Sequence, residues 1–400
     1  MDLRSDKPFA LLRHGLMQVY PSLQQDISTD VAIIGAGITG SLIGWHLAKS
    51  GIPVTVVDRR HVAMGSTAAS TALLQYEIDT PLQKLMKLVG EKNAVLSYLL
   101  CRQAIYDIKD LSLQLNTPTG FALRPSLQYA SFKRDAHKLE LECQLRKKIG
   151  INVEWLDNES LRGKFGFDKP AGMLSADGAV MDPYQFTHAL LKDASTKGLQ
   201  VYDNTRVEHI SHEKDKVILK TEWDHTITAK QLIIACGYES QEHLPHRVEQ
   251  LRSTYSIISE PLTEGQLWYK NAMIWETADP YLYLRTTEDH RIIIGGKDDP
   301  FSNPARRDAN IPRKSTLLEN SFRRLFPHIP FRTDFAWAGT FAGTKDGLPY
   351  IGAIPARPHT WFALGYGGNG IIFSMIAARI LNDLMTGKNN PYAAIFSFDR

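Results

Sequence analysis

The stretch Asp30–Asp58, DVAIIGAGITGSLIGWHLAKSGIPVTVVD, decides the fold. Its two apolar, β-branched runs, Val31–Ile34 and Val54–Val57, are typical of buried strands. The segment between them has the composition of a helix up to Lys49, and Gly51 then ends it. The order of these pieces predicts a strand, a glycine turn, a helix and a second strand.

The glycines of this stretch have the G-x-G-x-x-G spacing and separate physical roles. Gly35 makes a tight turn, Gly37 lets backbone N–H groups approach a pyrophosphate, and Gly40 lets the helix pack closely on the strand. Asp58 follows about 20 residues later, the distance expected for an acid that binds a ribose hydroxyl. A glycine-rich turn without a ligand is the alternative, but the flanking strands and the terminal acid favour dinucleotide binding.

Composition and charge exclude several classes of protein. The chain has 400 residues and a formal net charge of +3, which favours neither nucleic acid nor a membrane surface as a partner. Its three cysteines, Cys101, Cys143 and Cys236, are far apart and form no C-x-x-C pair. They read as reduced thiols, so we expect a cytoplasmic protein without disulfides. The thirteen histidines show no metal-ligand spacing, and we expect no metal.

Neither end of the chain predicts membrane insertion. Residues 1–29 contain no apolar core of a signal peptide, and we interpret them as a polar lead-in of unknown role. The apolar segment Gly370–Met385 contains Arg379, Asn382 and Asp383, so it predicts a buried helix and no membrane span.

Three later segments also have features of a nucleotide-binding site. Arg59–Gln75 is rich in small and hydroxyl side chains, which suit a backbone pressed against a ligand; a flexible loop is the alternative. Gln231–Cys236 predicts a buried parallel strand that ends at Gly237. From Leu251 the pattern becomes β, and Gly365–Gly370 is a second glycine turn before the apolar helix.

Five motifs together carry a family resemblance: the AIIGAGITG turn, MGSTAASTALLQ (64–75), IIACG (233–237), GTKDGLPYIG (343–352) and GYGGNGIIFS (365–374). The sequence resembles the D-amino-acid-oxidase superfamily of FAD-dependent oxidoreductases, and within it the glycine oxidase and sarcosine oxidase branch. The resemblance implies an α/β fold, in which a discontinuous Rossmann-like FAD-binding domain is interleaved with an antiparallel-sheet substrate domain (α+β). We assign residues 30–80, 172–250 and 332–400 to the first domain, and 81–171 and 251–331 to the second.

The resemblance also implies a set of FAD-binding residues, with FAD held non-covalently. The first glycine turn would hold the pyrophosphate, Asp58 the ribose, Val207 the adenine through its backbone, and the second glycine turn the pyrimidine end of the flavin. The full set is Gly35, Ala36, Gly37, Ile38, Thr39, Gly40, Asp58, Arg59, Ser66, Thr67, Thr71, Ala72, Leu73, Val207, Gly237, Gly343, Asp346, Gly365, Tyr366, Gly367, Gly368, Asn369, Gly370, Ile371 and Ile372.

The sequence departs from the family at the positions that bind substrate. Phe341 and Gly368 stand where glycine oxidases have arginines for the substrate carboxylate, and Ile372 where sarcosine oxidases have a lysine. Gly339 stands near the position of the cysteine that tethers flavin in sarcosine oxidases, so no covalent bond is expected.

We therefore expect an enzyme that oxidises a C–N bond of an amine or amino-acid-like compound, with oxygen or an electron carrier as acceptor. A dehydrogenase for hydroxy acids and a flavin-binding subunit of a larger complex are the alternatives. The oligomeric state and the catalytic groups are not specified by the sequence. The candidate pocket residues are Gln75, Tyr283, Arg285, Phe341 and Gly368.

Alternatives are open for several of these side chains. Tyr283 is equally compatible with core packing, and Arg285 with a surface or interdomain ion pair. Glu77 and Asp79 are candidates to flank an amine, although a solvated loop is the favoured interpretation for both.

Overall fold

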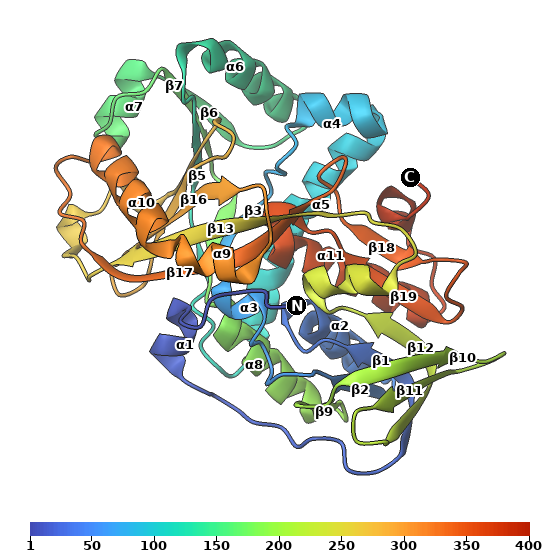
Figure 1. Ribbon diagram of the computed structural model, residues 1–400. Helices are drawn as coiled ribbons and strands as arrows, with labels where there is room; N and C mark the ends of the chain where they lie inside the picture. The colour runs from blue at the N-terminus through green and yellow to red at the C-terminus, as the bar shows by residue number, and fades with distance from the viewer.

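Two large β-sheets form the frame of the protein, and helices lie between and around them (Figure 1). The computed structural model describes residues 1–400. The first sheet is mainly parallel and the second mainly antiparallel, so the α/β fold with an interleaved antiparallel sheet is confirmed.

The first sheet contains the βαβ unit expected from the sequence. Its strand order is β10-β11-β12-β1-β2-β9. Strand β19 pairs with the last residues of β12, beyond those that pair with β11, and also with β18. Strand β1 lies between β12 and β2, and all three run parallel, with Val31 opposite both Gln231 and Val54. The bounds of the strands are β1 Ile27–Ile34, β2 Val54–Val57, β9 Gln200–Tyr202, β10 Val207–His212, β11 Val217–Thr221, β12 Thr226–Ile234, β18 Tyr350–Ala353 and β19 Thr360–Leu364.

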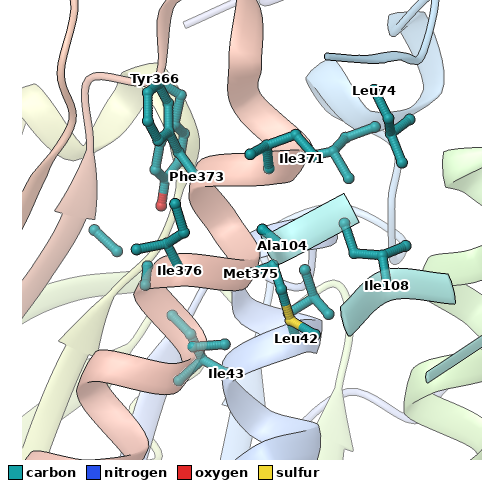
Figure 2. Close-up of a cluster of buried hydrophobic side chains, with 14 of the residues drawn as sticks. Leu42, Ile43, Leu74, Ala104, Ile108, Tyr366, Ile371, Phe373, Met375 and Ile376 are labelled. Carbon is teal, nitrogen blue, oxygen red and sulfur yellow. The ribbon is translucent and has the colours of Figure 1, made fainter. Parts of the chain in front are cut away.

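A helical layer covers this sheet and forms the main hydrophobic core. Helix α11 (Gly370–Met385) packs against α2 (Ile38–Lys49) and α5 (Glu91–Gln114), and α2 also packs against α8 (Pro183–Ser195). Figure 2 shows side chains of α2, α5 and α11 meeting in this core, with Leu74 beside them. Helix α11 is buried along most of its length, as its apolar sequence predicts. No helix combines the length and apolar character needed to cross a bilayer.

The second sheet has the order β17-β13-β16-β15-β14-β5-β7-β6, antiparallel except for the pair β14–β5. One face packs on helix α10 (Ile311–Leu325), where a separate hydrophobic cluster forms around Tyr255, Leu284 and Phe322. The bounds of the strands are β5 Ser126–Tyr129, β6 Val153–Asp157, β7 Ala171–Ser175, β13 Gln250–Ser259, β14 Met273–Glu276, β15 Tyr283–Thr286, β16 Ile292–Asp299 and β17 Thr333–Gly343.

The remaining elements are a small sheet, six α-helices and five 3₁₀ turns. A three-stranded sheet has the order β3-β8-β4, with β3 Leu73–Gln75, β4 Ala122–Leu123 and β8 Gly178–Val180. The remaining α-helices are α1 Phe9–His14, α3 Ser66–Ala69, α4 Leu82–Val89, α6 Lys133–Lys148, α7 Asn158–Phe165 and α9 Pro304–Ala309. The 3₁₀ turns are η1 Gly237–His243, η2 Glu264–Gln266, η3 Tyr269–Asn271, η4 Gly367–Asn369 and η5 Ala393–Phe396.

Strand pairing crosses two of the expected domain boundaries. Strands β7 and β17 were assigned to the FAD-binding domain, but β7 pairs with β5 and β6, and β17 pairs with β13 along its whole length. Both strands therefore belong to the second sheet. Their apolar character alone does not distinguish the two sheets, because pairing between segments distant in sequence decides it.

Candidate cofactor and substrate site

A cavity of about 720 Å³ lies between the two sheets. One end is lined by the carboxyl ends of β1, β2 and β12, which is where parallel α/β sheets bind ligands. The other end is lined by residues of β13, β15, β16 and β17 from the second sheet. The same hollow is therefore shared by a nucleotide-binding edge and an antiparallel wall.

The first glycine turn brings the start of α2 to the cavity. A Cβ atom on Gly40 would lie 1.8 Å from the Gly35 carbonyl oxygen, so only glycine allows the helix to approach the turn this closely. The Ile38 N–H donates a 3.0 Å hydrogen bond to the Thr67 hydroxyl, which joins α2 to α3. Because the first N–H groups of a helix have no partner within the helix, this end of α2 suits a phosphate.

Asp58 braces the same turn. Its Oδ2 accepts a 2.8 Å hydrogen bond from the Ala36 N–H, and its Oδ1 accepts a 2.8 Å hydrogen bond from the Arg60 N–H. Burial raises the pKa of Asp58 above its usual value, and these two N–H donors act in the opposite direction. Each carboxylate oxygen has a second lone pair, so Asp58 retains acceptor capacity for a hydroxyl in the cavity.

Glu239 of η1 lies beside Asp58 and was not expected from the sequence. Its carboxylate accepts hydrogen bonds from the guanidinium groups of Arg59 and Arg60. Burial raises the pKa of Glu239, but the paired guanidinium groups of Arg60 and Arg59 outweigh burial and lower it overall. All three residues line the cavity, together with Val207.

The second glycine turn is fixed against the first. The Asn369 amide donates 2.9 Å hydrogen bonds to the carbonyl oxygens of Gln75 and Glu77. The hydroxyls of Thr39 in α2 and Ser374 in α11 lie 2.8 Å apart. These bonds hold the N-terminal ends of α2 and α11 at the same cavity, and a positive helix end there favours negative charge on a ligand.

Two buried hydroxyl groups at the cavity have no partner within the protein: Ser66 Oγ and Tyr366 Oη. Buried polar atoms are nearly always hydrogen-bonded. Their lack of a partner, at a cavity whose glycine turns leave backbone donors free, fits a polar ligand that covers both turns.

The wall of the second sheet carries hydroxyl, aromatic and acidic side chains. Thr254 and Ser256 of β13, Tyr283 of β15 and Phe341 of β17 line the cavity. Tyr283 fills the space above its neighbour on β16, since a Cβ atom on Gly295 would lie 2.3 Å from the Tyr283 hydroxyl.

Charge is distributed unevenly along the cavity. The basic lining residues belong to β2, β10, η1 and the segments next to them at the nucleotide end; they are Arg59, Arg60, Arg206, His209 and His243. The wall of the second sheet has no lysine, arginine or histidine in the lining, and its charged member is Asp298.

Residues 30–384 match the family of FAD-dependent oxidoreductases designated DAO. The chain belongs to this family. It is an FAD-dependent oxidoreductase, and the glycine turns, the free hydroxyls and Asp58 fit that cofactor.

Several known proteins resemble the chain over nearly all of its length. Glycine oxidase of Geobacillus kaustophilus (strain HTA426) is 25% identical over 93% of this chain and 97% of its own. Gamma-glutamylputrescine oxidoreductase of Escherichia coli (strain K12) is 23% identical over 94% of this chain and 88% of its own. The crystal structure of glycine oxidase from Geobacillus kaustophilus superposes with a TM-score of 0.78 at 20% identity, covering 93% of this chain and 99% of that one.

Most residues proposed for FAD do line the cavity. Those that do not are Ala36 and Gly40, which act within the first turn, and Gly343, Asp346 and Gly365. Asp346 forms an ion pair with Arg400 at 2.9 Å and accepts a 3.0 Å hydrogen bond from the Leu348 N–H. It therefore supports the GTKDG loop and lies outside the cavity lining.

Among the pocket candidates, Gln75, Tyr283, Phe341 and Gly368 line the cavity, whereas Arg285 does not. The Arg285 guanidinium donates to the carbonyl oxygens of Thr71 and Thr286. Burial lowers the pKa of Arg285 to about 10, so the group stays charged at neutral pH. Arg285 lies two residues after Tyr283 on the same face of β15. Its bond to Thr71 places it against the loop that contains Thr71 and outside the cavity lining.

The solvated-loop interpretation of Glu77 was wrong. Its side chain is 1% exposed and lies 3.9 Å from the equally buried guanidinium of Arg146, so it belongs to the core. Asp79 is exposed, but it is also bonded: it accepts hydrogen bonds from the Gly368 N–H at 2.9 Å and the Tyr281 hydroxyl at 3.0 Å.

The sequence reasoning missed the wall residues Thr254, Ser256, Tyr281 and Asp298, and also Leu3 of the lead-in. Leu3 reaches the cavity because residues 3–5 bond to β17: the Thr340 N–H donates to the Leu3 carbonyl, and the Ser5 N–H to the Ala338 carbonyl. Strand alternation predicts that Tyr281 shares a face with Tyr283, so this signal was present in the sequence.

Proposed function

We propose that the protein oxidises a carbon–nitrogen bond of an amine or amino-acid-like substrate with non-covalent FAD. The observation that carries this proposal is the charge of the second-sheet wall, which has a carboxylate, Asp298, and no basic residue in its lining. A hydroxy acid is an anion and requires a cation or several donors for its carboxylate. An amine is a cation in water and suits an acidic wall.

In this reaction the residues of the chain bind and orient the substrate. FAD, when bound, supplies the chemistry by accepting a hydride from the carbon that carries the nitrogen. The reacting nitrogen would have to release one proton to solvent first, because its lone pair forms the second bond to carbon when the hydride leaves. The N-terminal end of α11, placed by Asn369 at the cavity, would favour negative charge on the part of the cofactor held beside it.

The named activities of two relatives support an amine or amino acid as the substrate. One is a glycine oxidase and the other a gamma-glutamylputrescine oxidoreductase, and each aligns with more than nine-tenths of this chain. For the acceptor we propose oxygen or an electron carrier. We also retain, as part of this proposal, the division into an FAD-binding and a substrate domain and the role of Asp58 at the ribose.

The composition of the wall also argues, within this proposal, against a simple amino acid as substrate. Phe341 offers no hydrogen bond to a carboxylate, and burying an unpaired carboxylate beside it would cost several kcal/mol. Its cross-strand neighbour is Arg252, whose side chain is 42% exposed and lies 3.9 Å from Asp279. Arg252 is therefore a cation outside the lining, already facing an acid.

The proposal is tested by mixing the FAD-bound protein under argon with amines, amino acids and hydroxy acids of matched chain length. Loss of the yellow flavin absorbance reports reduction. We expect reduction by amines and weak or no reduction by hydroxy acids; the reverse order would refute the proposal. Failure of all three classes would favour a flavin-binding subunit. Addition of oxygen or a quinone to the reduced protein then identifies the acceptor.

A further inference from the structure

We propose that Asp298, together with Tyr281 and Tyr283, forms a subsite that binds an alkylammonium group. This inference rests on the proposed function and narrows its substrate class to amines with a net positive charge, such as diamines. Three features of the wall carry it: an irregular strand, an unpartnered carboxylate oxygen and two aromatic side chains.

The first feature is a β-bulge in β16. The register between β13 and β16 shifts between Ser253 and Tyr255, and Lys297 has a φ of 58°, a left-handed conformation that is uncommon for lysine. Bulges of this kind change the direction of a side chain and occur beside active sites. Asp298 lies within the bulge and on the cavity face, and Asp299, the next residue, lies on the opposite face.

The second feature is the contrast between these two acids. Asp299 is fully occupied: it accepts hydrogen bonds from the Lys314 ammonium at 2.6 Å and the Tyr255 hydroxyl at 2.8 Å. Asp298 has a buried Oδ1 with no hydrogen-bond partner. Such an atom in a native protein calls for an explanation, and a ligand donor in the cavity provides one.

Burial also changes the acidity of Asp298. It raises the pKa of this carboxyl to about 6, against the smaller opposing effects of Thr254 and Arg252. The group is therefore ionised at neutral pH but poorly stabilised by its surroundings. A ligand cation would supply the missing partner.

The charged groups around Asp298 do not fill this role. Lys314 is bound to Asp299 on the far face of the sheet, and Arg252 faces Asp279 outside the cavity lining. The remaining neighbour is Asp79, a second acid that raises the pKa of Asp298 further. The net charge at this end of the cavity is therefore negative.

The third feature is aromatic. Tyr281 and Tyr283 both line the cavity, with ring centroids 5.8 Å apart, and Trp275 lies 6.0 Å from Tyr281. The faces of aromatic rings attract cations, and a carboxylate beside them adds a full counter-charge. An alkylammonium group matches both, because its charge is compact and its carbon atoms are apolar.

A binding test separates this subsite from catalysis. Tetramethylammonium cannot lose a proton from nitrogen, and tert-butanol is a neutral compound of similar size. We expect the FAD-bound protein to bind tetramethylammonium more tightly than tert-butanol, as measured by calorimetry and by the change in the flavin spectrum. Equal affinity for the two compounds would overturn the proposal.

Variants assign the effect to Asp298. In Asp298→Asn the affinity for tetramethylammonium should fall roughly thirtyfold or more, as expected when one partner of a desolvated ion pair is removed. Asp298→Glu should keep part of the affinity. Asp279→Asn removes an acid that is 86% exposed and lies outside the cavity lining, and it should change little. If Asp279→Asn weakens binding as much as Asp298→Asn, general surface charge explains the effect and the subsite does not exist.

Reduction of the flavin distinguishes this inference from the proposed function. We expect 1,4-diaminobutane to reduce the flavin at lower concentrations than n-butylamine or 4-aminobutanoate, and Asp298→Asn to remove that preference while flavin content is unchanged. Amine oxidation that is indifferent to Asp298→Asn would overturn the subsite and leave the function standing. Reduction by 4-hydroxybutanoate alone would refute the function, whatever tetramethylammonium binding shows.

Discussion

Replacement of Asp58 by alanine tests the cofactor site at its most constrained point. This carboxylate has two roles. It accepts 2.8 Å hydrogen bonds from the N–H groups of Ala36 and Arg60, and it has lone pairs left for a ribose hydroxyl. A hydrogen bond to a charged group contributes about 1.5–3 kcal/mol. Loss of the ribose contact alone should therefore weaken FAD binding by roughly one to two decades.

The two bonds within the protein predict a second effect. Asp58→Ala leaves the N–H groups of Ala36 and Arg60 without their acceptor, so the free protein should also lose stability. Asp58→Asn retains one carbonyl oxygen and can satisfy only one of these donors. We expect its affinity for FAD to lie between those of the wild type and the alanine variant.

The assay is a titration of flavin-free protein with FAD, followed by quenching of flavin fluorescence, with FMN in parallel. Asp30→Ala is the matched control, because Asp30 lies on β1 and forms an exposed ion pair with Lys230 at 2.8 Å. Exposed pairs contribute about 0–1 kcal/mol. An FAD dissociation constant for Asp58→Ala within about twofold of the wild type would refute the ribose assignment.

Four further predictions follow from the same site. Because Gly339 offers no thiol, acid precipitation should release intact FAD into the supernatant, and flavin that stays with the polypeptide would contradict this. Gly40→Ala should abolish flavin retention, since the new Cβ would lie 1.8 Å from a carbonyl oxygen; Gly163→Ala, with nothing within 4 Å, is the control. Burial raises the folded-state pKa of Asp298 from 3.8 to about 6, so the folded protein binds more protons than the unfolded chain and stability falls as pH rises through this window. Asp298→Asn should then raise the free energy of unfolding of the flavin-free protein above about pH 6 by roughly 1–3 kcal/mol, and equal urea midpoints at high pH would count against it. Phe341→Arg should increase flavin reduction by glycine or sarcosine, because a guanidinium can make two parallel hydrogen bonds to a carboxylate; unchanged rates would remove Phe341 from the substrate wall.

The nucleotide half of the site could be predicted because its signals are local. The glycine spacing, the two β-branched runs and Asp58 occupy one continuous stretch, so sequence distance and spatial distance agree there. The same holds for the turn before α11, where the glycines and the apolar helix are adjacent. Each of these segments could be interpreted without knowledge of its partners.

The substrate wall could not be predicted in the same way. Asp298 reaches the cavity through a bulge, and one extra residue in a strand leaves no clear trace in the hydrophobic pattern. Arg285 and Glu77 were misplaced because their positions depend on neighbours more than 60 residues away, Thr71 and Arg146 respectively. Alternation predicts which side chains of a strand share one face. It does not predict which of them reach the cavity and which lie against other segments.

The distribution of the cavity lining along the chain has a consequence for the order of biosynthesis. The lining extends from Leu3 to Ser374, and the first glycine turn is translated more than 300 residues before the second. At about 5–20 residues per second, tens of seconds separate the two on the ribosome. During that interval the βαβ unit lacks α11 and the Thr39–Ser374 bond that positions it. We therefore expect the nascent chain to bind FAD only after translation has passed α11. A ribosome-bound chain stalled before Gly370 should be colourless.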